Sequence, residues 1–227
     1  MDVDLIYILD DRAGDTSLHV KGELYKYLIK VRRHKVGDNV IFRNSTNIIV
    51  AHSYLLESIA PREAVFTFLK SAVKQMKPDR YFHIGWCVVD TKSVEKTLPM
   101  LNELGVSKIS FIYCKRSQKN FKPDINRFMR ILQSSSMQCG RTGMISLEII
   151  DSLGEFIAKY PDCAVLDFCD TALPDKHNFN TILIGCEGGF TQDERDEMSQ
   201  QKCYRLGIKM VLRSETAVIS VAAKSLL

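Results

Sequence analysis

The first third of the chain alternates short apolar runs with turn residues, a pattern typical of β-strands. One short helix fits around residues 23–30, and Gly37-Asp38 and Arg43-Asn44-Ser45 are turn signals between the apolar runs. Short strands with such turns predict a small β-barrel or a curled sheet. The expected strands are residues 5–9, 39–42, 48–50 and 64–68.

After residue 80 the pattern changes to strands that alternate with helices, which predicts an α/β layer with a largely parallel sheet. The polar stretch 70–79 separates the two patterns, so we expect one domain over residues 1–70 and a second over 71–227. The expected strands are 81–89, 108–113, 163–168, 181–185 and 203–206, and the expected helices are 91–104, 123–138, 152–159, 192–201 and 215–227.

Three residues punctuate the expected helices. Gly105 stands where a helix C-terminal glycine belongs, and Pro123 stands in a first helical turn. Pro99 lies inside the helix 91–104 and is expected to kink or divide it.

Two helices have readable faces. In 123–138 a buried stripe at i, i+3, i+4, i+7 spacing leaves a polar face with Arg127, Arg130, Ser134 and Gln138, joined by Arg141 if the helix extends that far. The segment 215–227 is apolar except along Thr216, Ser220 and Lys224. A helix this apolar is buried in its own domain or against a second subunit.

Composition narrows the class of protein. The 227 residues are 45% apolar and 26% charged, as in an ordinary globular protein and unlike a disordered or fibrous one. No apolar run approaches the ~18 residues of a membrane-spanning helix. The acidic start Met1-Asp2-Val3-Asp4 is unlike a secretory signal, so we expect a cytoplasmic protein.

Cysteine and histidine usage argues against a metal site and a disulfide framework. The seven cysteines include no Cys-x-x-Cys pair and lie in mostly apolar surroundings. We expect reduced, buried thiols with no disulfide. The five histidines are scattered without ligand spacing, so no metal is expected.

Basic residues gather in two segments although the net charge is only +4. Residues 26–35 hold five basic residues and no acidic one, and 115–141 hold seven basic residues, Lys119 among them, with Asp124 alone against them. Two such segments predict contacts with phosphates, the alternative being solvated surface charge.

The segment 182–194 is the strongest candidate for chemistry. An apolar strand enters a loop with glycines at 185, 188 and 189, and a helix follows with Thr191 and Glu194 as a capping box. Glycines at the carboxyl end of a strand allow a ligand to approach the backbone. The loop matches neither the P-loop nor the dinucleotide fingerprint, so a nucleotide-phosphate cradle is disfavoured, and a tight turn without a ligand remains open.

A second segment, 206–217, precedes the last helix. Ser214 has the chemistry of an N-cap, and Glu215 suits the positive end of the helix dipole. Arg213 gains nothing from that dipole, so it is explained better by a bound anion or by a carboxylate such as Glu187.

Together these motifs resemble the RsmE family of 16S ribosomal RNA (uracil-N3)-methyltransferases, in the SPOUT class. The resemblance rests on Ile-Gly-x-Glu-Gly-Gly-Phe-Thr-x-x-Glu at 184–194 and on Leu-Arg-Ser-Glu-Thr-Ala at 212–217. Val31-Arg32-Arg33, Glu103-Leu104-Gly105-Val106, Arg116 and Gln138-Cys139-Gly140-Arg141 extend it, in order, over nearly the whole chain. Met100, Met137 and Cys186 depart from the family's usual residues.

The resemblance implies a fold, a cofactor and partners. The fold is an N-terminal PUA-like β-barrel that binds RNA, followed by a SPOUT α/β domain with a C-terminal trefoil knot. The cofactor is S-adenosylmethionine, and the partners are 16S rRNA or the small ribosomal subunit and a second copy of the chain in a homodimer. The implied cofactor-binding residues are Leu166, Ile184, Gly185, Glu187, Gly188, Gly189, Leu206, Gly207, Val211 and Leu212.

The implied reaction is in-line methyl transfer to uracil N3, which must also lose a proton. Arg213 is the first choice for stabilising the uracil anion, and Glu215 for contacting the base or ordering Arg213. The residues implied to bind RNA are Arg32, Arg33, Lys35, Arg116, Arg127, Arg130, Gln138 and Arg141. Two other functions stay open: a methyltransferase that modifies another base or a ribose 2′-oxygen, and an RNA-binding assembly factor that has lost turnover.

Overall fold

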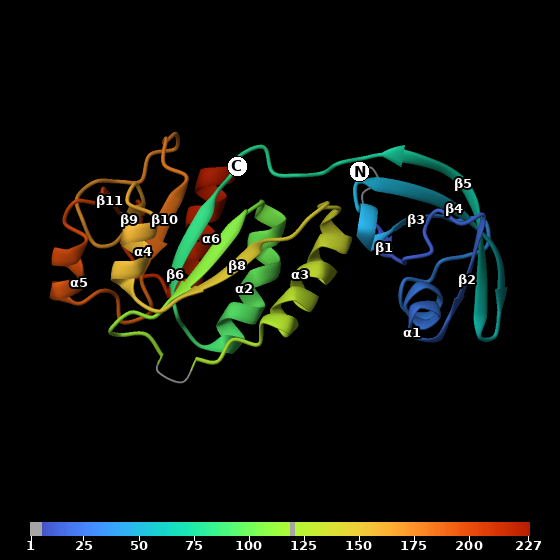
Figure 1. Cartoon of the computed structure of the whole chain (residues 1–227), viewed down its shortest axis with the longest axis horizontal. Coiled ribbons are helices and arrows are strands. Elements are labelled where there is room, and N and C mark those ends of the chain that lie inside the picture. Colours follow the sequence, from blue (N-terminus) through green and yellow to red (C-terminus); the bar gives the residue numbers. More distant parts are fainter. Residues whose placement is uncertain (1–5, 119–120) are drawn as a thin grey trace. The chain divides into compact units, whose positions relative to one another are not determined.

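The computed structural model describes residues 6–118 and 121–227, and the chain divides into two compact units. The N-terminal unit contains the chain up to Lys77 together with Ser136–Gly143. The α/β unit contains Pro78–Ser135 and Met144–Leu227. Figure 1 shows the elements of both units in sequence colours.

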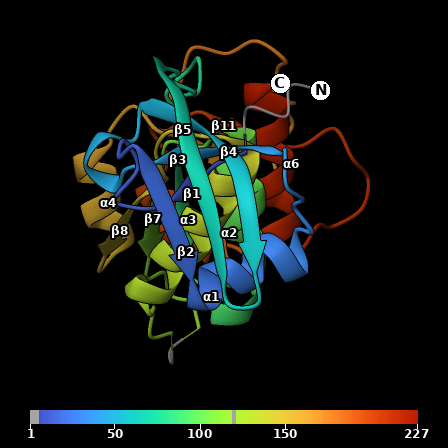
Figure 2. The same ribbon diagram turned by 90° about the vertical axis from the view of Figure 1, so that its right-hand side faces the viewer.

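The N-terminal unit is built on a five-stranded mixed sheet of order β1-β3-β4-β5-β2, in which β1 and β3 are parallel and the other pairs antiparallel. Figure 2 shows β5 between β2 and β4. Register shifts between β4 and β5, at Ser53/Tyr54 and Leu56/Ser58, interrupt the regular pairing of these two strands. The strands are β1 (Ile8–Leu9), β2 (Ser17–Lys21), β3 (Asn39–Arg43), β4 (Val50–Ala60) and β5 (Glu63–Val73).

Of the four expected strands, 5–9, 39–42 and 64–68 correspond to β1, β3 and β5. The expected strand 48–50 is mostly wrong, because residues 48 and 49 lie in a turn and only Val50 belongs to β4, while β2 was missed. β2 escaped prediction because only Leu18 and Val20 in it are apolar, although both are fully buried. β5 extends at its far end into exposed, more polar residues, whereas in β4 the polar His52 and Ser53 interrupt the apolar pattern of a mostly buried stretch. The expected helix is α1 (Gly22–Tyr25) continued by a π-helical turn, η2 (Lys26–Val31), and a 3₁₀ turn, η3 (Ser45–Asn47), follows β3. Leu5, in the first expected strand, lies outside the described residues.

The α/β unit contains a six-stranded, fully parallel sheet of order β11-β9-β10-β6-β7-β8. The predicted parallel α/β layer is thereby confirmed. The strands are β6 (His83–Cys87), β7 (Lys108–Ile112), β8 (Ser146–Ile150), β9 (Ala164–Leu166), β10 (Thr181–Ile184) and β11 (Cys203–Tyr204). β6 is the first strand of this sheet in the chain, with β7 and β8 on one side of it and β9, β10 and β11 on the other. The carboxyl ends of β9, β10 and β11 therefore lie side by side at one half of the sheet.

Helices cover both faces of this sheet. Phe156 of α4 packs so closely on Gly85 of β6 that a Cβ there would lie 2.4 Å from the ring. On the opposite face, Phe128 of α3 stacks near Phe111 of β7, and α2 packs against α6. The helices are α2 (Thr91–Leu104), α3 (Ile125–Cys139), α4 (Leu153–Lys159), α5 (Gln192–Glu197) and α6 (Ser214–Leu226).

Two local predictions for α2 have different outcomes. Gly105 adopts a left-handed φ of 96° as the C-cap, as predicted, and the Asp90 carboxylate caps the N-terminus by accepting from the Ser93 N–H. The expected division at Pro99 is wrong, because the helix continues through it. The carbonyl of Pro99 accepts a hydrogen bond from the Ser135 hydroxyl of α3, which ties the proline turn to its neighbour.

The expectation that all cysteines are reduced is wrong for one pair. Cys87 ends β6 and Cys114 follows β7, and since these strands are parallel neighbours, the two residues meet with their Cα atoms 5.9 Å apart and form a disulfide. Sequence spacing gave no sign of it, because the sheet creates the proximity. The other five cysteines are free, and Cys139, Cys169 and Cys203 are only half-buried.

Candidate active site

A cavity of about 300 Å³ opens at the carboxyl ends of β9, β10 and β11. Its walls come from the segments that follow these strands and from the start of α6. The cavity has the size and the position at the strand ends that small-molecule sites in open α/β sheets favour. Nine of the ten residues expected to bind the cofactor line it, namely Leu166, Ile184, Gly185, Glu187, Gly188, Gly189, Leu206, Val211 and Leu212, whereas Gly207 does not.

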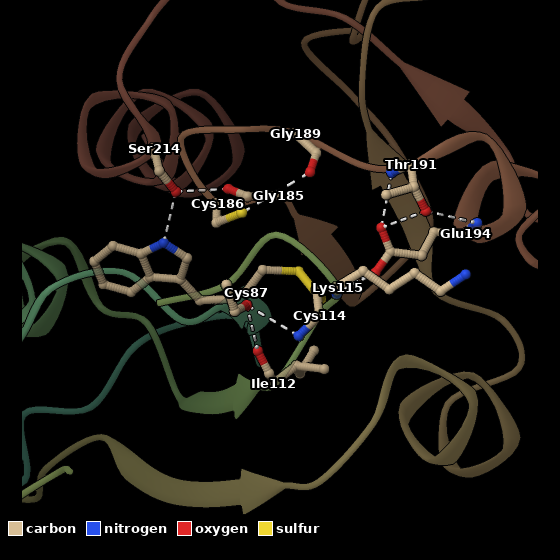
Figure 3. Close-up of a disulfide and its surroundings, with 12 residues drawn as sticks. Cys87, Ile112, Cys114, Lys115, Gly185, Cys186, Gly189, Thr191, Glu194 and Ser214 are labelled. Carbon is tan, nitrogen blue, oxygen red and sulfur yellow. Dashed lines mark hydrogen bonds between the residues drawn. A yellow bond between two sulfur atoms is a disulfide. The ribbon is translucent and has the colours of Figure 1, made fainter. Parts of the chain in front are cut away.

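The segment Gly185–Phe190, here called the glycine loop, links β10 to α5. Thr191 caps α5, and Glu194 closes the capping box by accepting from the Thr191 N–H at 2.8 Å, which confirms the prediction. The other Glu194 oxygen accepts from the backbone N–H of Lys115 at 2.7 Å (Figure 3). Glu194 is therefore buried and hydrogen-bonded, and it joins the end of the glycine loop to the segment after β7.

Ser214 fastens the start of the glycine loop. Its hydroxyl donates to the carbonyl oxygen of Gly185 at 2.6 Å and accepts from the indole N–H of Trp86 at 2.8 Å (Figure 3). Its expected role as a helix cap is wrong: the N-cap of α6 is Arg213, without a side-chain cap hydrogen bond, and Ser214 is the first helical residue. The hydroxyl is occupied by a tertiary contact that a local capping rule cannot detect.

Arg116 lies in the wall of the same cavity. One of its terminal guanidinium nitrogens donates to the carbonyl of Gly188 at 2.7 Å and to that of Phe190 at 3.3 Å. The sequence assigned Arg116 to RNA, and nothing in its position after a strand revealed a contact with a loop 72 residues further along the chain.

The cavity wall also holds charged residues that sequence reasoning missed. Asp167 and Arg195 form a two-pronged ion pair, with Nε to Oδ2 at 2.7 Å and a second contact of 3.3 Å, and both line the cavity with Arg205. The exposed Phe168 also lines it. The position of Asp167 and Phe168 at the end of an expected strand was the signal that was available in the sequence.

The two expected catalytic residues, Arg213 and Glu215, lie on either side of Ser214 in the sequence. Ser214 lines the cavity, but these two residues do not. Arg213 has a side chain that is 79% exposed, and its guanidinium lies 4.0 Å from a carboxylate oxygen of Glu215, whose side chain is 20% exposed. Of the two partners considered for Arg213, an anion and a carboxylate such as Glu187, the ion pair found among the described residues is with Glu215.

The residues expected to bind RNA are distributed over both units. Arg32, Arg33 and Lys35 are exposed in the turn after η2, where Arg33 has a left-handed φ of 61°. On α3, Arg130 and Gln138 are exposed. Arg127 is paired with Glu95, whose Oε2 accepts a 2.8 Å hydrogen bond from Nη2 of Arg127. The last expected member, Arg141, lies beyond the end of α3 and is only 9% exposed, and burial lowers its pKa. Lys119, in the second basic segment, lies outside the described residues.

Cys186, in the glycine loop, is a buried free thiol. Its Sγ contacts the carbonyl of Gly189 at 3.8 Å, and burial raises the pKa of the thiol. A thiol that stays protonated is a poor nucleophile and metal ligand. Cys186 therefore contributes to the wall of the cavity by packing and not by reactivity.

The described part of the chain contains neither a cluster of metal ligands nor a membrane-spanning helix. No group of three or more histidine, cysteine or acidic side chains there is arranged to hold a metal ion. No helix among residues 6–118 and 121–227 has the length and apolarity required to cross a bilayer.

Comparisons with known proteins agree with this geometry. A family model described as an RNA methyltransferase domain matches residues 76–225. Ribosomal RNA small subunit methyltransferase E of Helicobacter pylori is 34% identical over 221 residues, which are 96% of this chain and 97% of that protein. The protein of the same name from Buchnera aphidicola subsp. Acyrthosiphon pisum is 24% identical over 236 residues, covering 96% of this chain and 91% of the relative.

A solved structure shares the fold. Ribosomal RNA small subunit methyltransferase E of Neisseria gonorrhoeae, crystallised with bound S-adenosylmethionine, superposes with a TM-score of 0.75 at 19% identity. The superposition covers 96% of this chain and 95% of that one.

Proposed function

We propose the activity of this chain from its family membership: it belongs to the RNA methyltransferase family through residues 76–225, and a ribosomal RNA small subunit methyltransferase E is 34% identical to it over nearly its whole length. The chain is an S-adenosylmethionine-dependent methyltransferase of small-subunit ribosomal RNA. Its product is a uridine of 16S rRNA methylated at N3. The observation that carries the proposal is the cavity at the ends of β9, β10 and β11, walled by nine of the ten residues expected to hold the cofactor.

The wall of the cavity fits S-adenosylmethionine. Apolar side chains such as Leu166, Ile184 and Leu212 suit an adenine ring, and Arg205 supplies a cation for a carboxylate. A Cβ on Gly185 would lie 3.3 Å from the Phe190 ring, so any larger residue would press on that ring and glycine suits this tight loop. When bound, the cofactor would supply a methyl group on a sulfonium, and Glu187 would be the carboxylate of the wall that offers a counter-charge, since Asp167 is paired with Arg195.

The chain's own residues position the methyl donor and stabilise the negative charge that develops on the uracil. The glycine loop and residues 206–212 hold the donor, and the apolar wall excludes water from it. Arg213, with an exposed guanidinium beside the cavity segments, stabilises the negative charge that grows on uracil as N3 gives its proton to solvent water. Glu215 orders Arg213 through their ion pair or contacts the base.

The RNA contacts belong to the exposed cations. Arg32, Arg33 and Lys35 of the N-terminal unit and Arg130 of α3 contact phosphates, and Gln138 adds a neutral contact. Arg127 contributes less because Glu95 neutralises it. Arg141 is too buried to serve the same purpose through its guanidinium.

The domain types, the knot and the homodimer are also proposals, and they too rest on the family membership of the chain. We assign a PUA-like RNA-binding domain to residues 1–70 and a SPOUT domain to 71–227, close to the division of the chain at Lys77. The strand order of the parallel sheet is consistent with a trefoil knot formed by the segments after β9, β10 and β11. The active molecule is a homodimer in the cytoplasm, although the apolar face of α6 is already buried against α2 and β10 of its own chain.

The test is methyl transfer to ribosomal particles. Purified protein is incubated with labelled S-adenosylmethionine and with small subunits from cells that lack this methylation, and large subunits are the matched control. Label in the small-subunit RNA alone supports the proposal. Cofactor binding without transfer to any particle would favour an RNA-binding assembly factor that has lost turnover. Label on another nucleotide or on a ribose would favour a methyltransferase of different specificity.

A further inference from the structure

Arg116 is the side chain that holds the far half of the glycine loop. Its Nη1 lies 2.7 Å from the carbonyl oxygen of Gly188 and 3.3 Å from that of Phe190. A charged donor gives stronger hydrogen bonds than a neutral one, and both acceptors are backbone atoms of the segment that walls the cavity. The start of the loop is held separately by Ser214 through Gly185.

The segment that carries Arg116 is itself fixed. The Cys114 N–H donates to the Ser117 hydroxyl at 2.9 Å, and the Ser117 N–H donates to the Cys114 carbonyl at 3.0 Å, which makes a tight turn. The Lys115 N–H is bound to buried Glu194 at 2.7 Å, and its ammonium pairs with Asp193. The turn also follows the Cys87–Cys114 disulfide (Figure 3). Arg116 is thus presented to the loop from a rigid base.

The packing between Arg116 and the loop favours a glycine at position 188. A Cβ on Gly188 would lie 3.2 Å from both Cβ and Cδ of Arg116, tighter than ordinary van der Waals contact. The arginine stem therefore lies along the bare backbone of Gly188. The next residue, Gly189, takes a left-handed φ of 63°, which completes the turn toward Phe190.

We propose that Arg116 is a positioning residue for the cofactor site, which keeps the carbonyls of Gly188 and Phe190 turned toward its guanidinium and so keeps the glycine loop in the shape that receives the cofactor. The proposal rests on the proposed function, because it takes S-adenosylmethionine as the ligand of the cavity. It replaces the sequence-based expectation that Arg116 contacts RNA phosphates, since the guanidinium is engaged by the protein's own backbone.

The experiment compares cofactor and RNA binding in variants of the full-length protein. Calorimetry with S-adenosylmethionine is run on wild type, Arg116→Ala, Arg116→Lys and the control Lys96→Ala, which removes one exposed cation from α2. We expect Arg116→Ala to weaken cofactor binding at least ~10-fold, the loss of two charge-assisted hydrogen bonds. Arg116→Lys, which keeps the charge and a donor, should recover part of the loss, and Lys96→Ala should bind as wild type.

Two further measurements separate positioning from a general structural or RNA role. Hydrogen exchange in the free protein should become faster in Arg116→Ala within residues 185–191 and stay unchanged in α4. The salt dependence of binding to small-subunit RNA should keep its wild-type slope. Gly188→Ala should weaken cofactor binding in wild type and much less in an Arg116→Ala background, because its added methyl acts against the Arg116 side chain.

Each outcome decides between the possibilities. Wild-type cofactor affinity in Arg116→Ala overturns the inference and leaves the proposed function intact, as does a lower salt slope with unchanged cofactor binding, which would return Arg116 to the RNA contacts. If the wild-type protein itself fails to bind S-adenosylmethionine, the proposed function fails first.

Discussion

The indole N–H of Trp86 donates a 2.8 Å hydrogen bond to the hydroxyl of Ser214, across 128 residues of sequence. Trp86 is fully buried in β6. Ser214 begins α6, and its hydroxyl donates a hydrogen bond to the carbonyl oxygen of Gly185. One hydroxyl therefore joins the central strand, the glycine loop and the last helix. The chain uses its single tryptophan as a fixed point for the cofactor cavity.

Replacing Ser214 by alanine should both destabilise the protein and weaken cofactor binding. The change leaves the buried indole N–H without an acceptor, which costs about 1–3 kcal/mol of unfolding free energy, and it frees the Gly185 carbonyl. Urea unfolding and calorimetry with S-adenosylmethionine measure the two effects. Ser220→Ala, on the same helix, is the control and should change neither quantity appreciably; equal effects of the two substitutions would remove the role assigned to Ser214.

Arg213→Ala should lower methyl transfer at least ~100-fold and leave cofactor affinity nearly unchanged. The reason is that its exposed guanidinium does not line the cavity but lies next in the chain to Leu212 and Ser214, which do. Single-turnover kinetics with small subunits and calorimetry with the cofactor give the two numbers. Lys96→Ala removes an exposed cation from α2, away from the cavity segments, and should turn over nearly normally. Turnover close to wild type in Arg213→Ala would exclude it from catalysis.

Acid should destabilise the α/β unit through His83. Burial, followed by the positive charge of Lys108, lowers its pKa to about 4. Between the unfolded pKa of 6.5 and that value the unfolded chain binds a proton that the folded chain does not, so stability is lost as the pH falls. The ring also hydrogen-bonds the Ser110 hydroxyl at 2.8 Å, and Ser110 donates to Glu148, which fixes the neutral ring in place.

The expected loss from His83 is about 2 kcal/mol of unfolding free energy between pH 7 and pH 5. Urea unfolding at both values, in wild type and in His83→Gln, measures it as the difference between the two proteins. Glu148 acts at lower pH: burial alone would raise its pKa, but hydrogen bonds from Lys159, Lys108 and Ser110 outweigh burial and lower it. The same pH dependence in both proteins would show that His83 does not titrate as described.

RNA affinity should depend steeply on salt, and two arginines of α3 should contribute unequally. Arg130 is exposed and has no partner among the described residues, whereas Arg127 is paired with Glu95. Arg130→Ala should lower the slope of log affinity against log salt by about 0.7 to 0.9, the value for one phosphate contact, and Arg127→Ala by less. Fluorescence anisotropy with a fragment of small-subunit RNA measures both slopes. A larger change of slope in Arg127→Ala than in Arg130→Ala would show that the ion pair with Glu95 does not keep Arg127 from contacting RNA.

Local signals in the sequence were sufficient where the structure is locally determined. The helix over Thr91–Leu104 has its own cap at Asp90 and its own terminating Gly105, and its bounds were predicted. The glycine loop and the capping box of Thr191 and Glu194 were readable for the same reason. β8 was not, because it is an edge strand whose residues are mostly only partly buried, so its apolar pattern is weak.

Contacts between distant segments escaped prediction. Ser214 satisfies a local capping rule, yet its hydroxyl is bound to Trp86 and Gly185. Cys87 and Cys114 are brought together by strand pairing, and Arg116 meets the glycine loop only once α5 is in place. The sequence therefore predicted which segments form the site, and the side chains that fasten these segments to one another required the structure.

The chemical position of the added methyl group tests the central claim most directly. Small-subunit RNA methylated by the purified protein with labelled S-adenosylmethionine is digested to nucleosides, and the labelled nucleoside is identified by mass spectrometry and mapped to its position. The account predicts one labelled species, N3-methyluridine, from a single position of 16S rRNA. Label on a ribose 2′-oxygen, on another base, or on no nucleoside while the cofactor binds would contradict it.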